Sequence, residues 1–152
     1  MQLNNGFKVI INEKVLNEFK EFQNTSDFMV ESGGILAGYF QHMKSTFVIT
    51  DITWPMMKDV QCKYSFKRRD IGHQKTMDKL WQESGFKKSY LGEWHSHNES
   101  VPKPSFVDIA NWKKINSRKN NYEVNLFIIL GRESLKIWYV YGNDVNEIRS
   151  GE

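Results

Sequence analysis

The sequence contains little cysteine and little proline. Cys62 is the only cysteine among 152 residues, and there are three prolines. A single cysteine excludes an intramolecular disulfide and a zinc site built from several cysteines. It also suits a reducing compartment, so we expect a cytoplasmic protein. No repeat, linker or low-complexity segment marks a boundary, and the length is typical of one domain. We therefore expect residues 1–152 to form a single domain.

Long apolar runs and a strong excess of one charge are also missing. No run approaches the roughly 18 apolar residues that cross a bilayer, and the N-terminal segment lacks the basic and then apolar pattern of a secretory signal. The 21 basic and 18 acidic residues give a formal net charge of +3, which is too small to indicate a nucleic-acid partner by itself. We expect neither a membrane nor a nucleic-acid partner. Hydrophobic residues, at 39%, are numerous enough to build a core.

Local patterns predict a mixed chain of strands and helices. Runs rich in β-branched and aromatic residues predict strands over 7–11, 33–40, 46–54, 63–67, 89–97, 124–130 and 135–141, with a hairpin turn at 42–45 and a loop over 55–62. Helices are predicted after Asn12, from a cap at Asp70 to Ser84 with a stop at Gly85, and from Ser105. Their expected buried faces are Val15, Leu16, Phe19 and Phe22; Met77, Leu80 and Trp81; and Ile109, Trp112 and Ile115. This mixed order indicates an α+β, three-layer domain.

Two of the four histidines, His95 and His97, stand two residues apart on a predicted strand. Side chains alternate faces along a strand, so both rings project to one side and can reach one metal ion. A loop of seven residues then leads to a predicted helix start, and Asp108 in its first turn can supply an oxygen ligand. Two histidines and one carboxylate, with a fourth position open to water, form the catalytic type of zinc site.

Each part of this pattern also has a structural explanation. A His-x-His pair alone is weak evidence of metal binding. Ser105 and Asp108 have the spacing of a helix capping box, and taken alone that is the better interpretation. Glu31, a candidate general base, precedes Ser32-Gly33-Gly34 and by itself resembles a solvated loop acid. These separate explanations do not account for the combination of the signals at this spacing.

The combination resembles the JAMM motif of the JAB/MPN metallopeptidases: Glu31, then His95-Ser96-His97, seven residues, and Ser105-x-x-Asp108. The similarity continues to about Trp112, and residues 65–70, 73–74 and 90–95 resemble the stand-alone prokaryotic JAB subgroup. The resemblance implies a three-layer α-β-α domain of the cytidine-deaminase-like kind, with a mixed sheet between helices. The subgroup is found beside ubiquitin-like conjugating enzymes, and one branch accompanies CD-NTases (cyclic-nucleotide synthases) in anti-phage operons.

The resemblance also implies a role for each motif residue. His95, His97 and Asp108 would bind Zn²⁺, with water in the fourth position. Glu31 would accept the proton of that water and pass it to the leaving amine. Ser105 would donate a hydrogen bond to the tetrahedral oxyanion. Its capping and catalytic roles need not conflict, but one hydroxyl proton cannot serve two acceptors at once.

The implied reaction is hydrolysis of a peptide or isopeptide bond after the C-terminal tail of a ubiquitin-like protein. The substrate would be a conjugate made by a companion system, with a modified CD-NTase as one candidate. An extended tail can add as a strand beside the edge at residues 63–66. For several residues the sequence leaves two interpretations open. Each could contact the tail or a metal ligand, or could be an ordinary surface or core residue. These residues are Glu93, Arg68, Arg69, Trp54, Met56 and Met57.

Two other functions compete with a zinc isopeptidase. The first is a catalytically silent MPN scaffold that only binds a ubiquitin-like partner; such scaffolds typically lack motif residues, whereas all five are present here. The second is a nuclease or nucleic-acid binder, which the Lys113-Lys114 and Arg118-Lys119 pairs favour slightly. These pairs lie on a predicted helix whose other face is apolar, which is normal for a surface helix. The sequence leaves the oligomeric state open.

Overall fold

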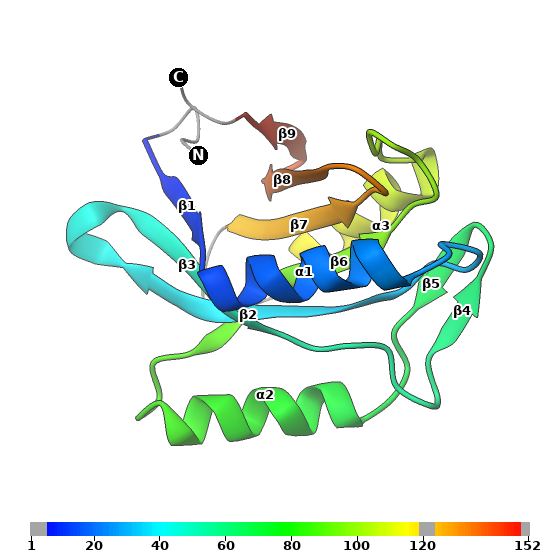
Figure 1. Cartoon of the computed structure of the whole chain (residues 1–152). Coiled ribbons are helices and arrows are strands. Elements are labelled where there is room, and N and C mark those ends of the chain that lie inside the picture. Colours follow the sequence, from blue (N-terminus) through cyan, green and yellow to red (C-terminus); the bar gives the residue numbers. More distant parts are fainter. Residues whose placement is uncertain (1–5, 119–123, 150–152) are drawn as a thin grey trace.

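A seven-stranded mixed sheet forms the centre of the molecule (Figure 1). The computed structural model describes residues 6–118 and 124–149. The strands lie in the spatial order β1 (Lys8–Ile11), β3 (Thr46–Ile52), β2 (Gly33–Gln41), β6 (Ser89–Ser96), β7 (Val124–Leu130), β8 (Leu135–Tyr141) and β9 (Asp144–Ile148). The pairs β1–β3 and β6–β7 are parallel, and the other pairs are antiparallel. β6 is therefore a central strand, and pairing on both sides fixes the backbone that leads to the two histidines.

Helices cover both faces of this sheet. They are α1 (Glu13–Thr25), α2 (Gly72–Glu83) and α3 (Phe106–Asn116). Val15 and Phe19 of α1 join the larger core on one face, while Met77 of α2 and Trp112 of α3 join two smaller cores on the other. Successive side chains of β7 enter the cores on opposite faces of the sheet in turn, because neighbouring side chains of a strand point to opposite faces. The expected α+β, three-layer architecture is confirmed. None of the described helices is long and apolar enough to cross a membrane.

The predicted hairpin between the second and third strands is present. β2 and β3 pair in antiparallel register around a short 3-10 helix, η1 (His42–Lys44). Ser45 ends this turn with a φ of 46°, in the left-handed region. Gly85 follows α2 with a φ of 68°, which is the left-handed stop expected of a glycine at that position. Both turns are set by local sequence, which is why they were predictable.

Several local predictions are wrong. β4 (Val60–Cys62) lies within the predicted loop, where it pairs with β5 (Ser65–Lys67), and β9 was not predicted at all. Both strands are short, and β9 is largely polar, so neither has an apolar alternation. The N-cap of α2 is Ile71, because the Asp70 carboxylate accepts the N–H of Gly72 in a turn before the helix.

Two residues expected in the core are exposed. Leu16 of α1 is 45% exposed and Trp81 of α2 is 43% exposed. The fully buried side chains of α1 are Val15 and Phe19, and Leu16 lies at the border of the stripe that they form. Trp81 instead packs against Phe86, with ring centroids 4.4 Å apart, beyond the end of α2. His73 takes a buried position on α2, and this requires polar partners.

A buried polar network supplies those partners and holds the β4–β5 hairpin to the sheet. The side chains of His73 and Asp59 are fully buried, with His73 Nε2 2.6 Å from Asp59 Oδ2. His73 Nδ1 lies 2.6 Å from the hydroxyl of Thr53, just after β3. Asp59 also accepts backbone N–H groups from both flanks of the hairpin, those of Met56, Arg69 and Asp70. One carboxylate therefore closes the base of the segment that carries β4 and β5.

Candidate metal centre and active site

The end of β6 positions the two histidines. Burial alternates along β6, so that Trp94 and Ser96 enter the core while His95 lies on the face covered by α2 and α3. His97 follows directly after the strand, and its N–H donates to the carbonyl of Leu130 on β7 at 3.0 Å. The two Nε2 atoms lie 3.0 Å apart. The strand alternation expected from the sequence therefore brings both rings to one point.

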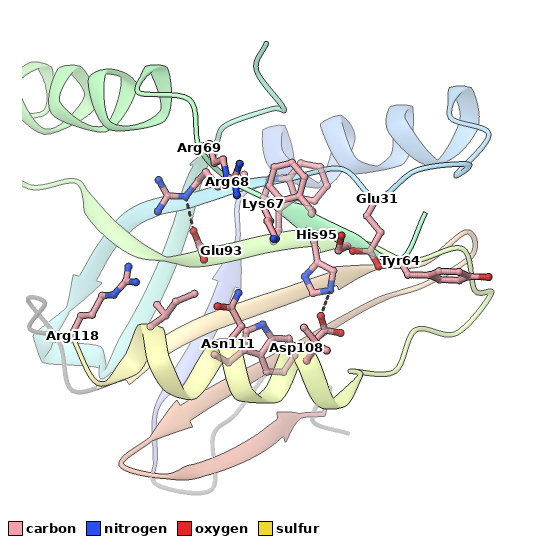
Figure 2. A pocket seen from close by; sticks show the side chains of 17 residues that line it. Glu31, Tyr64, Lys67, Arg68, Arg69, Glu93, His95, Asp108, Asn111 and Arg118 are labelled. Carbon is pink, nitrogen blue, oxygen red and sulfur yellow. Dashed lines mark hydrogen bonds and ion pairs between the residues drawn. The ribbon is translucent and has the colours of Figure 1, made fainter. Parts of the chain in front are cut away.

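Asp108 lies in the first turn of α3 and points towards His95 (Figure 2). Ser105 Oγ accepts the N–H of Asp108 at 3.1 Å, and Asp108 Oδ2 accepts the N–H of Ser105 at 2.8 Å. The predicted capping box is thus present, and it fixes the carboxylate so that it faces the imidazoles. Burial opposes ionisation of Asp108, but its contacts with His95 and His97 hold the pKa of this carboxyl well below its usual range.

The separations between donor atoms fit a tetrahedral metal. Asp108 Oδ1 is 3.2 Å from His95 Nε2, and Asp108 Oδ2 is 3.2 Å from His97 Nε2. Ligands at 2.0–2.1 Å from a tetrahedral zinc ion stand about 3.3–3.4 Å from one another. The two ring nitrogens and the carboxylate are therefore spaced as ligands of one ion would be, and the residues fit the metal that the sequence predicts.

Glu31 is the second carboxylate beside the histidines. Its Oε1 lies 3.4 Å from His97 Nε2, and ligand atoms of Glu31, His95 and His97 all fall within 4.8 Å of one another. Asp108 contacts both rings, whereas Glu31 has an ion-pair contact only with His97, so Asp108 is the better placed third ligand. Glu31 then remains available for proton transfer.

The surroundings of Glu31 rule out the solvated loop acid. The residue is only 8% exposed, and its N–H donates to the carbonyl of Cys62 on β4 at 2.8 Å. The side chain of Gln61 donates to the carbonyl of Glu31 at 3.3 Å. Burial raises the pKa of the Glu31 carboxyl, although His95 and His97 oppose the shift. A raised pKa makes this carboxylate a stronger base than an exposed glutamate.

Glu99 is a site residue that the sequence did not reveal. Its Oε1 lies 2.9 Å from His97 Nδ1, on the ring nitrogen that faces away from Asp108. A carboxylate at this position orients the ring and directs its other nitrogen to the centre, as in many metal sites. Burial opposes protonation of His97, but the contact with Asp108 and the nearby Glu31 and Glu99 carboxylates raise its pKa to about 8. Glu99 falls in a loop without a pattern, so only the fold identifies it.

The structure decides between the two interpretations for several of the residues named above. Glu93 lies on the histidine face, but its partner is Arg68, whose Nε is 2.6 Å away, and not a metal ligand. Trp54 belongs to the core, where it stacks on Phe22 with centroids 5.6 Å apart. Met57 is 98% exposed and does not fill the core.

A groove of about 260 Å³ runs past the centre (Figure 2). One wall is α3 from Val107 to just beyond its end at Arg118, and the other is the segment 64–69 with β5. The floor includes Glu93 and His95 of β6. Phe66 closes the groove against Gly33, where a Cβ atom would lie 2.5 Å from its ring. A glycine at position 33 is therefore required for the hairpin to approach β2.

The sheet order, the flanking helices and the site together define the class of the molecule. The chain belongs to the family of prokaryotic homologs of the JAB domain, which it matches over residues 14–151. This confirms the resemblance found in the motif. A solved structure of a protein from Desulfitobacterium hafniense has the same fold, with a TM-score of 0.64, 18% identity, and coverage of 93% of this chain and 90% of that chain.

Several relatives share one name. A protein of Escherichia coli (strain TW11681), named CD-NTase/cGAS isopeptidase, is 33% identical over 141 residues, which are 93% of this chain and 87% of the relative. A Pseudomonas aeruginosa protein with the same name is 31% identical over 91% of this chain and 86% of its own length. A Vibrio cholerae protein with this name is 30% identical over 82% of this chain and 77% of its own length.

Proposed function

We propose that this chain is a zinc-dependent isopeptidase of the cytoplasm. It cleaves after the C-terminal tail of a ubiquitin-like protein, or of a protein conjugated in the same manner, within a bacterial anti-phage CD-NTase system. The observation that carries the proposal is the convergence of two imidazole nitrogens and one carboxylate beside a second, buried carboxylate. The names of the relatives support a conjugate that involves a CD-NTase as the substrate.

In this mechanism His95, His97 and Asp108 hold the metal. When bound, zinc supplies Lewis acidity, which makes water a usable nucleophile near neutral pH. Glu99 keeps the ring of His97 in place through the nitrogen that does not face the metal.

Glu31 moves the proton. Its carboxylate accepts a proton from the attacking water and later donates it to the leaving amine, which for an isopeptide is a lysine side chain. The raised pKa of Glu31 suits this role, because its carboxylate accepts a proton more readily than that of an exposed glutamate. The backbone contacts with Gln61 and Cys62 hold Glu31 in position for this role.

Ser105 stabilises the oxyanion of the tetrahedral intermediate. Its Oγ uses a lone pair to accept the N–H of Asp108, so capping does not consume the hydroxyl proton. No described residue accepts a hydrogen bond from this hydroxyl, so its proton remains available to a developing negative charge. Capping and catalysis therefore use different parts of one hydroxyl group.

The extended tail binds beside β5. Among the described strands β5 pairs only with β4, and all three residues of β5 line the groove. An extended peptide can add to such an edge through main-chain hydrogen bonds. The groove then leads the tail towards His95 and Asp108, so that its terminal carbonyl reaches the centre.

The proposal is tested with zinc-loaded protein and an isopeptide conjugate of a CD-NTase tail with a lysine of a second protein. Glu31→Gln should lower kcat by roughly 10²- to 10⁴-fold, because it removes general acid–base catalysis. Zinc content, measured by elemental analysis, should stay at one ion per chain. The exposed α1 residue Glu13 offers a matched control, and Glu13→Gln should cleave like the unchanged protein. Full turnover by Glu31→Gln would contradict the assignment of the base, and stoichiometric zinc in His95→Ala would contradict the metal site.

A further inference from the structure

The two ends of the groove carry different chemistry. At one end lie His95, Asp108 and Glu31. Four cationic side chains from both walls also line the groove, and three of them lie towards the other end: Lys67 is the nearer one, and Arg68, Arg69 and Arg118 lie further away. Figure 2 shows Arg68 and Arg118 well away from Glu31, with Lys67 nearer the centre.

Three of these cations have no ion pair among residues 6–118 and 124–149. Arg68 is paired with Glu93, but no described carboxylate pairs with Lys67, Arg69 or Arg118. Lys119, which follows Arg118, lies outside the described residues. Cationic groups that face each other across a groove without counter-charges repel one another, and a carboxylate placed between them removes this repulsion.

We propose that this cationic end of the groove binds an acidic side chain of the substrate tail, four or five residues before the cleaved bond. The inference rests on the proposed function, because it takes the centre as the place of cleavage. From Asp108 to the end of α3 at Asn116 there are eight helical steps, which span about 12 Å, and Arg118 lies two residues further on, so the distance to be covered is about 15 Å. An extended chain covers this distance in about four or five residues, at about 3.3 Å per residue.

The tail, and not the acceptor side of the bond, spans this distance. On the amine side an isopeptide offers a single lysine side chain, which is too short to cross about 15 Å of groove. On the acyl side it offers an extended terminal segment whose backbone can pair with β5 along part of this wall.

The same charges favour a peptide over a nucleic acid. A polyanionic backbone would meet Glu93 along the groove and Asp108 and Glu31 at the centre, and these carboxylates would repel it. A peptide with one acidic residue avoids this repulsion. Glu93 also shows that a carboxylate fits there, since its Oε1 lies 2.6 Å from Arg68 Nε.

Binding of synthetic product peptides tests the inference. The probes are fluorescein-labelled decapeptides of Gly, Ser and Leu with a free C-terminus, in which the fourth or fifth residue from the end is Glu, Gln or Lys. With zinc-loaded Glu31→Gln protein, fluorescence anisotropy should show the Glu peptide binding about three- to tenfold more tightly than the Gln peptide, and the Lys peptide most weakly. The difference should shrink as salt is raised.

Variants assign the effect to particular residues. Arg69→Gln and Arg118→Gln should each remove most of the preference for Glu. Lys114→Gln, an exposed cation of the same helix outside the groove, should leave it unchanged. Glu93→Gln should increase the preference, because it frees Arg68 for the ligand. If the Glu93–Arg68 pair had a purely structural role, Glu93→Gln would instead lower the preference for the Glu peptide.

The outcomes separate this inference from the proposed function. Equal affinity for the Glu and Gln peptides, or no measurable binding of either, overturns the inference, while cleavage of the conjugate by the unchanged protein still supports the isopeptidase. A Glu preference that depends on Arg69 and Arg118, without cleavage of any conjugate, supports charge recognition and overturns the isopeptidase. Tighter binding of a single-stranded decanucleotide than of the Glu peptide overturns the inference in favour of a nucleic-acid site.

Discussion

Ser105 combines a structural and a chemical role at one oxygen atom. Its Oγ accepts the N–H of Asp108 and so caps α3, while its proton is free to donate. We expect Ser105→Ala to lower the free energy of unfolding by about 1 kcal/mol, because the cap is lost. It should also lower kcat by roughly 10²-fold or more, because the oxyanion loses a donor. Urea unfolding and steady-state cleavage measure the two effects separately.

Two further substitutions at position 105 separate the roles. Ser105→Thr keeps both the acceptor and the proton, so it should restore stability and most of the activity. Ser105→Asp keeps the capping acceptor but has no proton to donate, so it should be as stable as the unchanged protein and remain nearly inactive. Full activity of Ser105→Asp would show that this hydroxyl is not a donor to the oxyanion.

Residues differ in how far sequence alone could assign them. Strand alternation and helix capping are local rules, so the sequence could predict that His95, His97, Asp108 and Ser105 lie together, and the structure brings them together as expected. The burial of Glu31 could not be predicted, since it depends on contacts with β4, which the sequence did not reveal as a strand.

Helices and strands also differ in how far the sequence alone predicts them. The β2–β3 hairpin and the helices have local signals, and they were predicted with small errors at their ends. The parallel pairs β1–β3 and β6–β7 join segments far apart in the chain, so no local pattern specifies their register. β4 and β5 form a separate two-stranded sheet, and it depends on a buried network whose members, such as Asp59 and His73, are also distant in sequence.

Asp59 makes the stability of this hairpin segment dependent on pH. Burial opposes its ionisation, but the N–H of Asp70, the ring of His73 and two further N–H groups lower its pKa to about 2. The unfolded chain, with an ordinary carboxyl, binds its proton first as pH falls, so the stabilisation is present above about pH 5 and is lost as pH falls towards 2. From the ordinary value of 3.8 the shift corresponds to about 2–3 kcal/mol at pH 7, of which about half remains at pH 3.

Urea unfolding of Asp59→Asn at several pH values tests this. The variant should be about 2–3 kcal/mol less stable than the unchanged protein at pH 7, because the amide places a donor against the N–H of Met56. The difference should narrow by pH 3. Asp144→Asn, at an exposed position on β9, serves as control and should show no such change. A difference that stays constant from pH 7 to pH 3 would contradict this account of Asp59.

At the scale of the whole molecule, the centre ties a helix to the sheet. His95 and His97 come from the end of β6, and Asp108 comes from α3, whereas the hydrophobic cores on both faces of the sheet contain no ligand. We therefore expect the chain to fold without zinc and to gain stability with it. Free zinc at 100 times its Kd should add about 2.7 kcal/mol by mass action, which for a chain of this length raises Tm by about 5–10 °C.

Thermal unfolding in a chelator and in buffered zinc measures this gain. The unchanged protein and Glu31→Gln should show the same zinc-dependent rise in Tm, because Glu31 is not among the three ligands. His95→Ala and Asp108→Asn should lose the rise, since each lacks one of the atoms that converge at the centre. A rise of equal size in His95→Ala would mean that zinc stabilises the protein elsewhere. Loss of the rise in Glu31→Gln would instead make Glu31 the carboxylate that holds the metal, and it would transfer the proton-moving role to another group.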